Sequence, residues 1–256
     1  MSSMFSLEGK VAIVTGASRW TGKVIALEMA RAGVDLVISA RTPKPLEEAA
    51  AEVRGLGRRC LAVPTDVGDA AQVDHLIQKA MEEYGRIDIL VSNAGTPMGG
   101  SVPTLDLKQE AWDSDIRLNL TGHFLCSKAV APIMVRQGGG SIVAIASTAG
   151  LRVSPDAAGY TAAKAGLMHL VRKLAAEWGQ YHIRVNAVAP GIIAIPIFPA
   201  YLEHMPEVKA AYEKTPLKGG VKMEHIAAAV IYLASDAAGS ATGVTIPLDG
   251  GMILKI

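Results

Sequence analysis

The stretch that decides the fold covers residues 11–22 and reads VAIVTGASRWTG. Its first four residues form a short apolar run that is typical of a buried strand, and residues Gly22–Ala32 carry apolar side chains at helical spacing. A glycine-bearing turn therefore joins a strand to a helix. Such a turn leaves backbone N–H groups free at the positive end of the helix dipole, where a pyrophosphate binds favourably.

The alternation of strands and helices continues along the whole chain. Strands are predicted at Val11–Val14, Val34–Ala40, Cys60–Pro64, Ile87–Ser92, Ser141–Ala146, Arg184–Ala189 and Val244–Leu248. Helices are predicted at Gly22–Ala32, Leu46–Leu56, Ala70–Tyr84, about Gln109 to Arg136, Ala157–Trp178 and Met223–Ser235. Such repetition implies parallel strands joined by helical crossovers. We therefore predict one α/β domain over residues 1–256, a doubly wound (Rossmann) parallel sheet with helices on both faces.

Composition and charge exclude several classes of function. The 256 residues are 50% hydrophobic, and 25 basic residues balance 24 acidic ones, with no basic stripe that would favour a nucleic acid. No apolar run approaches the ~20 residues that a membrane span needs. Cys60 and Cys126 lack metal or redox spacing, and the six histidines are scattered. We expect a reduced, cytoplasmic setting and no metal, nucleic-acid or membrane partner.

The end of the second predicted strand bears on the choice of cofactor. A carboxylate there would bind a free ribose 2′-OH and repel a 2′-phosphate. The sequence has instead Ser39-Ala40-Arg41-Thr42, and Arg19 in the glycine turn could reach the same point. Two guanidinium groups near one dianion favour NADP(H) over NAD(H). The alternative is that both arginines are ordinary surface charges.

A second group of residues carries acid–base chemistry. Tyr160 and Lys164 are four residues apart on a predicted helix and so share a face. A free tyrosine has a pKa of about 10, and a nearby cation favours the phenolate, as general acid–base catalysis requires. Ser147 ends a predicted strand, where its hydroxyl could donate to a substrate oxygen, although turn serines are also common there.

These motifs together resemble the short-chain dehydrogenase/reductase family. The resemblance runs from about Gly9 to Gly251 and rests on residues 15–22, Asn93-Ala94-Gly95, Asn119, Ser147, Tyr160-x-x-x-Lys164, Pro190-Gly191 and Asp249-Gly250-Gly251. Each motif is modest in specificity, but their order and spacing make the joint match strong.

The resemblance implies roles for individual residues. The implied catalytic residues are Asn119, which anchors a proton-relay water, Ser147, which polarises the substrate oxygen, Tyr160, the acid/base, and Lys164, which holds the nicotinamide ribose. The predicted cofactor-binding residues are Gly16, Ser18, Arg19, Thr21, Gly22, Arg41, Asp66, Val67, Asn93, Gly95, Tyr160, Lys164, Pro190 and Ile193. Asp66 would accept from the adenine amino group. The family also implies a homotetramer and no catalytic metal.

Two positions depart from the family pattern. Trp20 replaces a glycine at which the backbone normally approaches the pyrophosphate closely. If its side chain points outward, binding survives; if it points inward, the site is partly filled. Ile195 stands where a hydroxyl residue commonly contacts the nicotinamide carboxamide. Without that hydrogen bond, we expect cofactor binding to be weaker by about 1 kcal/mol.

The predicted activity is NADP(H)-dependent interconversion of a ketone, or another carbonyl, and a secondary alcohol. The segment 192–220 is rich in proline and large apolar residues and is predicted to form a lid over the substrate, the alternative being a packing helix. With the apolar turn after Ser147, it favours a hydrophobic ketone or alcohol. Two alternatives remain: a cofactor-independent lyase or dehalogenase-like relative, favoured by Trp20, and a non-catalytic scaffold.

Overall fold

A computed structural model of the chain describes residues 4–96, 102–153, 158–195, 203 and 206–254. Its centre is a seven-stranded parallel sheet with the order β3-β2-β1-β4-β5-β6-β7. The strands are β1 (Val11–Thr15), β2 (Asp35–Ala40), β3 (Cys60–Pro64), β4 (Ile89–Ser92), β5 (Gly140–Ile145), β6 (Ile183–Pro190) and β7 (Thr245–Leu248). The order reverses between β1 and β4, so the predicted doubly wound sheet is confirmed.

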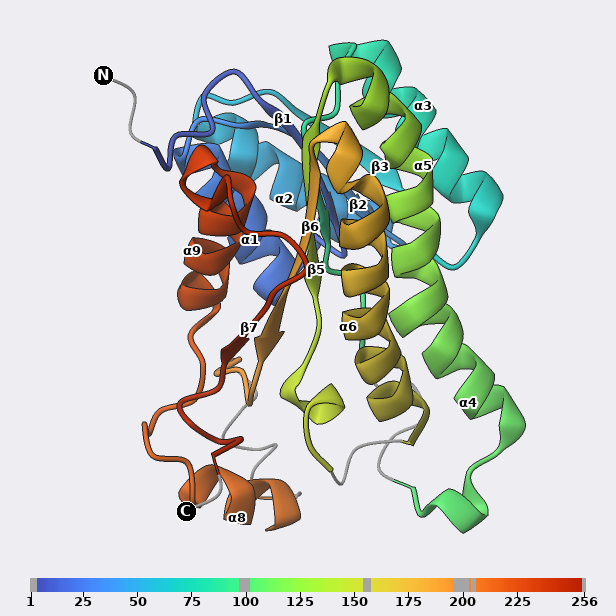
Figure 1. The fold of residues 1–256 in the computed structure, drawn as a ribbon, viewed down its shortest axis with the longest axis vertical. Coiled ribbons are helices and arrows are strands. Elements are labelled where there is room, and N and C mark those ends of the chain that lie inside the picture. Colours follow the sequence, from blue (N-terminus) through green and yellow to red (C-terminus); the bar gives the residue numbers. More distant parts are fainter. Residues whose placement is uncertain (1–3, 97–101, 154–157, 196–202, 204–205, 255–256) are drawn as a thin grey trace.

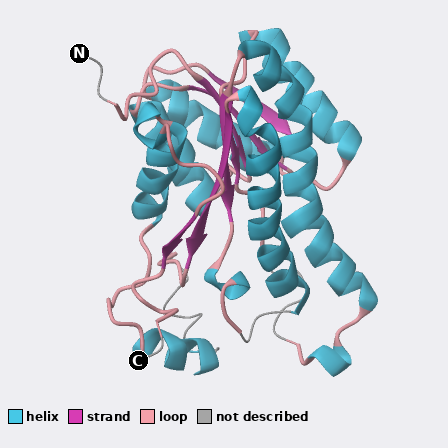
Figure 2. Cartoon of the chain, viewed as in Figure 1, coloured by secondary structure: helices cyan, strands magenta, loops and turns pink. Residues whose placement is uncertain are grey.

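Helices cover both faces of the sheet (Figure 1). One face carries α1 (Trp20–Arg31), α2 (Pro43–Gly55) and α9 (Met223–Ala234). The other carries α3 (Ala70–Tyr84), α4 (Gln109–Ile116), α5 (Gly122–Gln137) and α6 (Ala158–Trp178). The short helix α8 (Pro206–Glu213) lies beyond the ends of β6 and β7, away from both layers (Figures 1 and 2).

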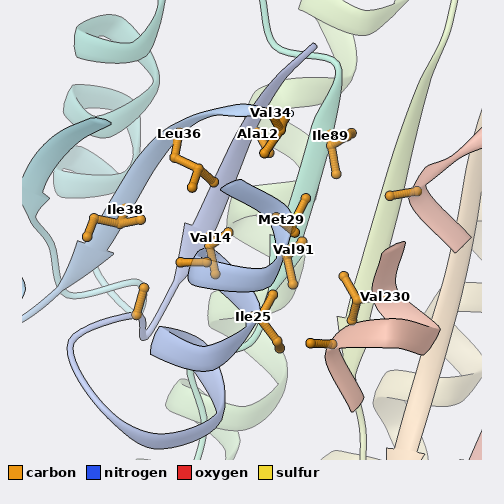
Figure 3. Close-up of a cluster of buried hydrophobic side chains, with 14 of the residues drawn as sticks. Ala12, Val14, Ile25, Met29, Val34, Leu36, Ile38, Ile89, Val91 and Val230 are labelled. Atoms are coloured by element: carbon orange, nitrogen blue, oxygen red, sulfur yellow. The ribbon is translucent and has the colours of Figure 1, made fainter. Parts of the chain in front are cut away.

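Two apolar cores, one on each face, hold these layers together. Along β1, Ala12 and Val14 belong to the core under α1, whereas Ile13 belongs to the core under α3, α5 and α6. This alternation is the two-residue period of a strand. Figure 3 shows Ile25 and Met29 of α1 packed over the sheet in the first core. Burial on both faces explains why the strands of this chain are continuous apolar runs.

Two predicted helices differ from the observed ones. The helix predicted from Gln109 to Arg136 contains a π-helical turn at Arg117–Thr121, between α4 and α5. The second helix begins at Pro43 rather than Leu46, because proline fits the first turn of a helix, where no N–H donor is needed.

The predicted lid lies partly outside the described residues, which omit 196–202 and 204–205. Within the described part, α8 places Val208 in a buried position. The lid therefore stays a prediction. None of the helices in the described ranges combines the length and apolar character of a membrane span. No group of three or more His, Cys, Asp or Glu side chains is placed to hold a metal ion in that same part of the chain.

Candidate active site

A cavity of about 670 Å³ opens at the carboxyl ends of the strands. Parallel strands bring their carboxyl ends to one edge, so residues far apart in sequence converge there. Every predicted cofactor-binding residue lines this cavity, and so do Ser147 and Arg152. Asn119 is buried and does not line it. The structure thus brings together the residues that sequence spacing alone left apart.

The glycine turn has no room for side chains at two of its positions. Gly16 has a φ of 67°, a left-handed conformation that favours glycine. A Cβ added at Gly22 would lie 2.2 Å from the carbonyl oxygen of Gly16. The turn is tied to the next strand by a hydrogen bond from the N–H of Ala17 to the carbonyl of Ser39. Close packing of turn and helix is therefore built into this segment.

Trp20 adopts a left-handed backbone conformation, which favours glycine. Its φ is 47°, and the side chain, 39% exposed, lies at the rim of the cavity. The guanidinium carbon of Arg19 lies 4.2 Å from the centre of the Trp20 ring. A non-glycine residue in this region is strained by about 1–2 kcal/mol. Trp20 thus lines the cavity and remains partly exposed to solvent.

Asp66 and Arg41 line the cavity where β3 and β2 end, and Arg19 lines it from the glycine turn. Arg19 and Arg41 are exposed and form no ion pair with a carboxylate of the described chain. Asp66 Oδ2 accepts a hydrogen bond from Arg117 at 3.0 Å, and Oδ1 accepts one from the N–H of Gly68 at 2.9 Å. Burial opposes ionisation of Asp66, but these hydrogen bonds and the nearby charges of Arg117 and Arg41 lower its pKa overall.

Thr15 and Asn93 join the ends of the two central strands. The Thr15 hydroxyl oxygen accepts from the N–H groups of Asn93, at 3.0 Å, and Ala94, at 3.1 Å. The Asn93 side chain donates in return to the carbonyl of Thr15 at 2.9 Å. These bonds fix the chain where β1 and β4 end, between the glycine turn and the acid–base residues.

Lys164 is buried beside Tyr160, and both residues line the cavity. Its Nζ donates to the carbonyl of Ile145 at 2.8 Å and lies 5.7 Å from the centre of the Tyr160 ring. Burial lowers the pKa of Lys164 from 10.5 to about 7. Helix α6 places both side chains on one face, as their spacing predicts.

Ser147 caps a short helical turn and still faces the cavity. Its Oγ accepts a hydrogen bond from the N–H of Ala149 at 3.1 Å. A hydroxyl that accepts retains its own hydrogen, which is free to donate. The turn-capping role and a donor role toward a ligand are therefore compatible.

Asn119 approaches Lys164 across Gly95. Its amide nitrogen donates to the carbonyls of Thr96, at 2.9 Å, and Asp115, at 3.1 Å. Its Oδ1 is buried and has no hydrogen-bond partner among the described residues. A Cβ added at Gly95 would lie 2.8 Å from this Oδ1 and 3.0 Å from Lys164 Nζ. The missing side chain at Gly95 thus leaves space between the two polar groups.

The segment after β6 is held by backbone bonds. The N–H of Gly191 donates to the carbonyl of Leu248 at 2.8 Å, and the N–H of Val221 donates to that of Ile192 at 2.8 Å. Pro190 and Ile193 line the cavity from this segment, and so does Ile195, the residue without the hydroxyl.

Three residues of this region were missed by the sequence-based prediction. Arg117 pairs with Asp66 across 51 positions of sequence, which no local pattern reveals. His123 is fully buried; burial, followed by the nearby charge of Lys164, lowers its pKa well below 6.5. Arg152 lines the cavity, although the prediction considered only its apolar neighbours. A lone basic residue within an apolar turn was the available signal.

Comparisons with known proteins agree with this geometry. The family model described as enoyl-(acyl carrier protein) reductase matches residues 16–253. A 3-oxoacyl-[acyl-carrier-protein] reductase from Synechocystis sp. is 38% identical over 98% of this chain and all of its own length. A short chain dehydrogenase/reductase from Aspergillus oryzae is 39% identical, over 98% of this chain and 97% of its own length.

A solved structure with a similar fold is a 7α-hydroxysteroid dehydrogenase in complex with NADH and 7-oxo glycochenodeoxycholic acid. It superposes with a TM-score of 0.91 at 33% identity, over 98% of each chain. The likeness covers nearly the whole length of both chains, and at this identity it extends to the sequence as well as to the fold. The protein is therefore an oxidoreductase that belongs to the short-chain dehydrogenase/reductase family.

Proposed function

We propose that this protein is an NADP(H)-dependent oxidoreductase that interconverts a ketone, or another carbonyl, and a secondary alcohol, with Tyr160 as the general acid/base. One observation carries the proposal: a single cavity contains Tyr160 beside the buried Lys164 and also two arginines, Arg19 and Arg41, without carboxylate partners in the described chain. The first pair suits proton transfer, and the second suits a dianionic ribose phosphate.

The residues at the glycine turn fit a dinucleotide. The crowded position of Gly22 is a cradle that a Cβ would fill, and the N-terminal end of α1 favours an anion in front of it. Gly16, Ser18 and Thr21 would hold the pyrophosphate there. Asp66 would accept a hydrogen bond from the adenine amino group, and Asn93 and Gly95 would contact the adenosine. The backbone at Pro190 and Ile193 would hold the nicotinamide carboxamide. Arg41 and Arg19 would pair with the 2′-phosphate.

The remaining side chains divide the proton chemistry among them. The Ser147 hydroxyl donates to the substrate oxygen, and the Tyr160 phenol gives its proton to that oxygen during reduction. A bound nicotinamide supplies the hydride in this direction and accepts it in the other. The Lys164 ammonium favours the resulting phenolate, and the unpartnered Oδ1 of Asn119 supports a water between it and Lys164.

Apolar side chains support a substrate with an apolar body. Ile192, Ile195 and Val208 line the same cavity as Tyr160, together with the apolar turn after Ser147. The related hydroxysteroid dehydrogenase binds a large ketone. A hydrophobic ketone or alcohol is the substrate class that we propose.

Trp20 favours a second candidate, a cofactor-independent lyase or dehalogenase-like enzyme. A large residue at the rim of the glycine turn is the specific observation in its favour. Lys164, Arg19 and Arg41 argue against this candidate, because without a nicotinamide cofactor these three cations would have no ligand to bind.

Binding of the two cofactors tests the proposal first. We would titrate the purified protein with NADPH and with NADH by tryptophan fluorescence and then assay reduction of a panel of hydrophobic ketones. Tight NADPH binding, weak NADH binding and turnover of a ketone are expected. Binding of neither cofactor at millimolar concentration would favour the cofactor-independent candidate; equal binding would remove the arginine argument.

Assembly and location complete the proposal. We expect a homotetramer that uses α5 and α6, since Phe124 and Val135 of α5 are large apolar residues with 40% and 39% exposure. Light scattering on the eluted protein would measure the mass. A cytoplasmic location stays a prediction.

A further inference from the structure

Arg152 lies in the wall of the proposed substrate site. It follows Ser147 by five residues, and its backbone N–H donates to the carbonyl of Thr148 at 3.2 Å, directly after the turn that Ser147 caps. It lines the same cavity as Ser147 and Tyr160. Its neighbours in sequence, Leu151 and Val153, are 44% and 95% exposed, so Arg152 is the residue of this segment that turns inward.

The guanidinium of Arg152 is poorly satisfied within the protein. Its Nη1 donates to the carbonyl of Val153 at 3.2 Å, and its Nη2 donates to the thioether sulfur of Met252, also at 3.2 Å. Thioether sulfur is a weak acceptor. Its Nε is buried without a hydrogen-bond partner, and no carboxylate of the described chain forms an ion pair with it. A buried donor without a partner is costly, so a strong acceptor is expected to reach it.

Met252, the sulfur partner of Arg152, lies in a hydrogen-bonded turn. Met252 is held by the turn after β7, in which Asp249 accepts hydrogen bonds from the N–H groups of Gly251 and Ile253, both at 2.9 Å. Met252 lines the cavity beside the apolar residues of the segment after β6. A partly buried cation beside apolar side chains interacts more strongly with an anion than an exposed cation does, because less water screens it.

From this arrangement we infer that Arg152 binds a carboxylate carried by the substrate, so that the enzyme acts on a keto acid or the corresponding hydroxy acid. The planar fork of a guanidinium matches a carboxylate with two parallel hydrogen bonds. Of the two arginines proposed for the cofactor, Arg19 lies in the glycine turn and Arg41 directly follows β2, whereas Arg152 follows Ser147. The inference rests on the proposed function and narrows its substrate from a hydrophobic ketone to one that also bears an acid group.

Matched pairs of substrates test this role. We would measure kcat and KM for acetoacetate, levulinate and longer linear keto acids, each beside its methyl ester, with wild type, Arg152→Gln and Arg152→Lys. The matched control is Arg31→Gln, since Arg31 is exposed at the end of α1 and pairs with Glu28. Thermal unfolding of each variant establishes that it is folded.

The wild type is expected to prefer at least one acid over its ester. Arg152→Gln should lower kcat/KM for that acid about 10- to 100-fold, about 1.4–2.8 kcal/mol, mainly through KM. The same substitution should change kcat/KM for the methyl ester by less than about twofold, because only the acid forms a charge-assisted pair with Arg152. Arg152→Lys should restore part of the loss, and Arg31→Gln should resemble wild type. Equal losses on acids and esters, or no loss on acids, would overturn the inference.

Calorimetric binding separates this inference from the proposed function. If the wild type reduces no ketone with either cofactor, the proposed function fails. The same acids and esters are then titrated into wild type and Arg152→Gln. Binding of an acid that Arg152→Gln loses supports the carboxylate site on its own, whereas no binding of any acid by the wild type refutes it.

Discussion

The guanidinium of Arg19 lies over the indole ring of Trp20, with 4.2 Å between the guanidinium carbon and the ring centre. A cation in this position is attracted to the ring by about 0.5–1 kcal/mol at an exposed site. The contact holds the largest side chain of the glycine turn at the rim of the cavity. It also keeps the Arg19 charge beside the turn that favours an anion.

Replacing Trp20 by glycine should improve cofactor binding with little change in stability. Glycine relieves about 1–2 kcal/mol of left-handed strain at φ 47°, but loses the contact with Arg19 and gains flexibility in the unfolded chain. We expect the Kd for NADPH to fall about fivefold, about 1 kcal/mol, because the backbone becomes accessible. Trp20→Ala removes the indole but keeps the Cβ. Comparing it with Trp20→Gly separates the effect of the indole's size from the effect of the backbone strain at this position. Weaker binding in Trp20→Gly would mean that the indole itself contacts the cofactor.

Charge reversal at Arg41 tests cofactor preference. Arg41→Asp should raise the Kd for NADPH about 100-fold and that for NADH less than about threefold, because only NADPH carries the 2′-phosphate that a guanidinium binds. Lys44→Asp is the matched control, since Lys44 is exposed three residues away and does not line the cavity. Fluorescence titrations measure all four values. Equal effects of Arg41→Asp on both cofactors would identify Arg41 as an ordinary surface charge.

The framework of the fold was predictable because its signals are local. The inner strands β1, β2, β4, β5 and β6 are buried on both faces and so read as largely apolar runs, and each helix shows its own periodicity. The start of α2 was placed at Leu46 rather than Pro43, because the first turn has no apolar residue to mark it. The π-helical turn at Arg117–Thr121 has no comparable sequence signal, since helical periodicity continues on both sides of it.

The sequence named most of the residues that line the cavity, but it did not reveal the contacts between them. Glycine-turn and Tyr160–Lys164 motifs locate the residues along the chain, and the parallel sheet brings them to one edge. The Arg117–Asp66 ion pair depends on two elements 51 residues apart. Arg152 was overlooked because exposed apolar neighbours surround it in sequence, and only the folded turn directs it inward.

Gly22 should tolerate no side chain. In Gly22→Ala the new Cβ would meet the carbonyl oxygen of Gly16 at 2.2 Å, so the turn must shift. We expect destabilisation of about 1–3 kcal/mol, as for other overpacked positions, and loss of NADPH binding. Gly55→Ala is the control, because Gly55 lies in α2 with no atom within 4 Å of the added Cβ; it should stabilise by about 0.5 kcal/mol. Chemical denaturation measures both. Unchanged stability in Gly22→Ala would contradict the packing argument.

Tyr160→Phe should abolish turnover and spare binding. Removing the proton donor should lower kcat about 100- to 10,000-fold, the usual contribution of a general acid, while the Kd for NADPH stays within about twofold. Tyr84→Phe is the control, because the Tyr84 hydroxyl donates to the carbonyl of Leu36 at 3.0 Å, remote from the cavity. That variant should lose about 1 kcal/mol of stability and no activity. Near-normal turnover by Tyr160→Phe would remove Tyr160 from its role.

Lys164 makes stability depend on pH in a direction that can be measured. Burial lowers its pKa in the folded protein from 10.5 to about 7, so between these values the unfolded chain holds a proton that the folded chain lacks. Unfolding then takes up a proton. The free energy of unfolding therefore rises by up to about 1.4 kcal/mol per pH unit between about pH 7 and pH 10.5. Below this range, both states are protonated and the full cost of burying the charge is present.

Lys164→Met should therefore be inactive yet more stable than wild type near neutral pH. Its advantage should shrink as the pH rises from about 7 to about 9, since wild-type Lys164 is by then neutral when folded. His123 is neutral in this range in both proteins and does not contribute. Lys173→Met is the control on the same helix, because Lys173 is exposed and pairs with Glu177. Denaturation of the cofactor-free proteins at several pH values gives the difference. A difference between Lys164→Met and wild type that stays constant with pH would show that Lys164 remains charged in the folded state.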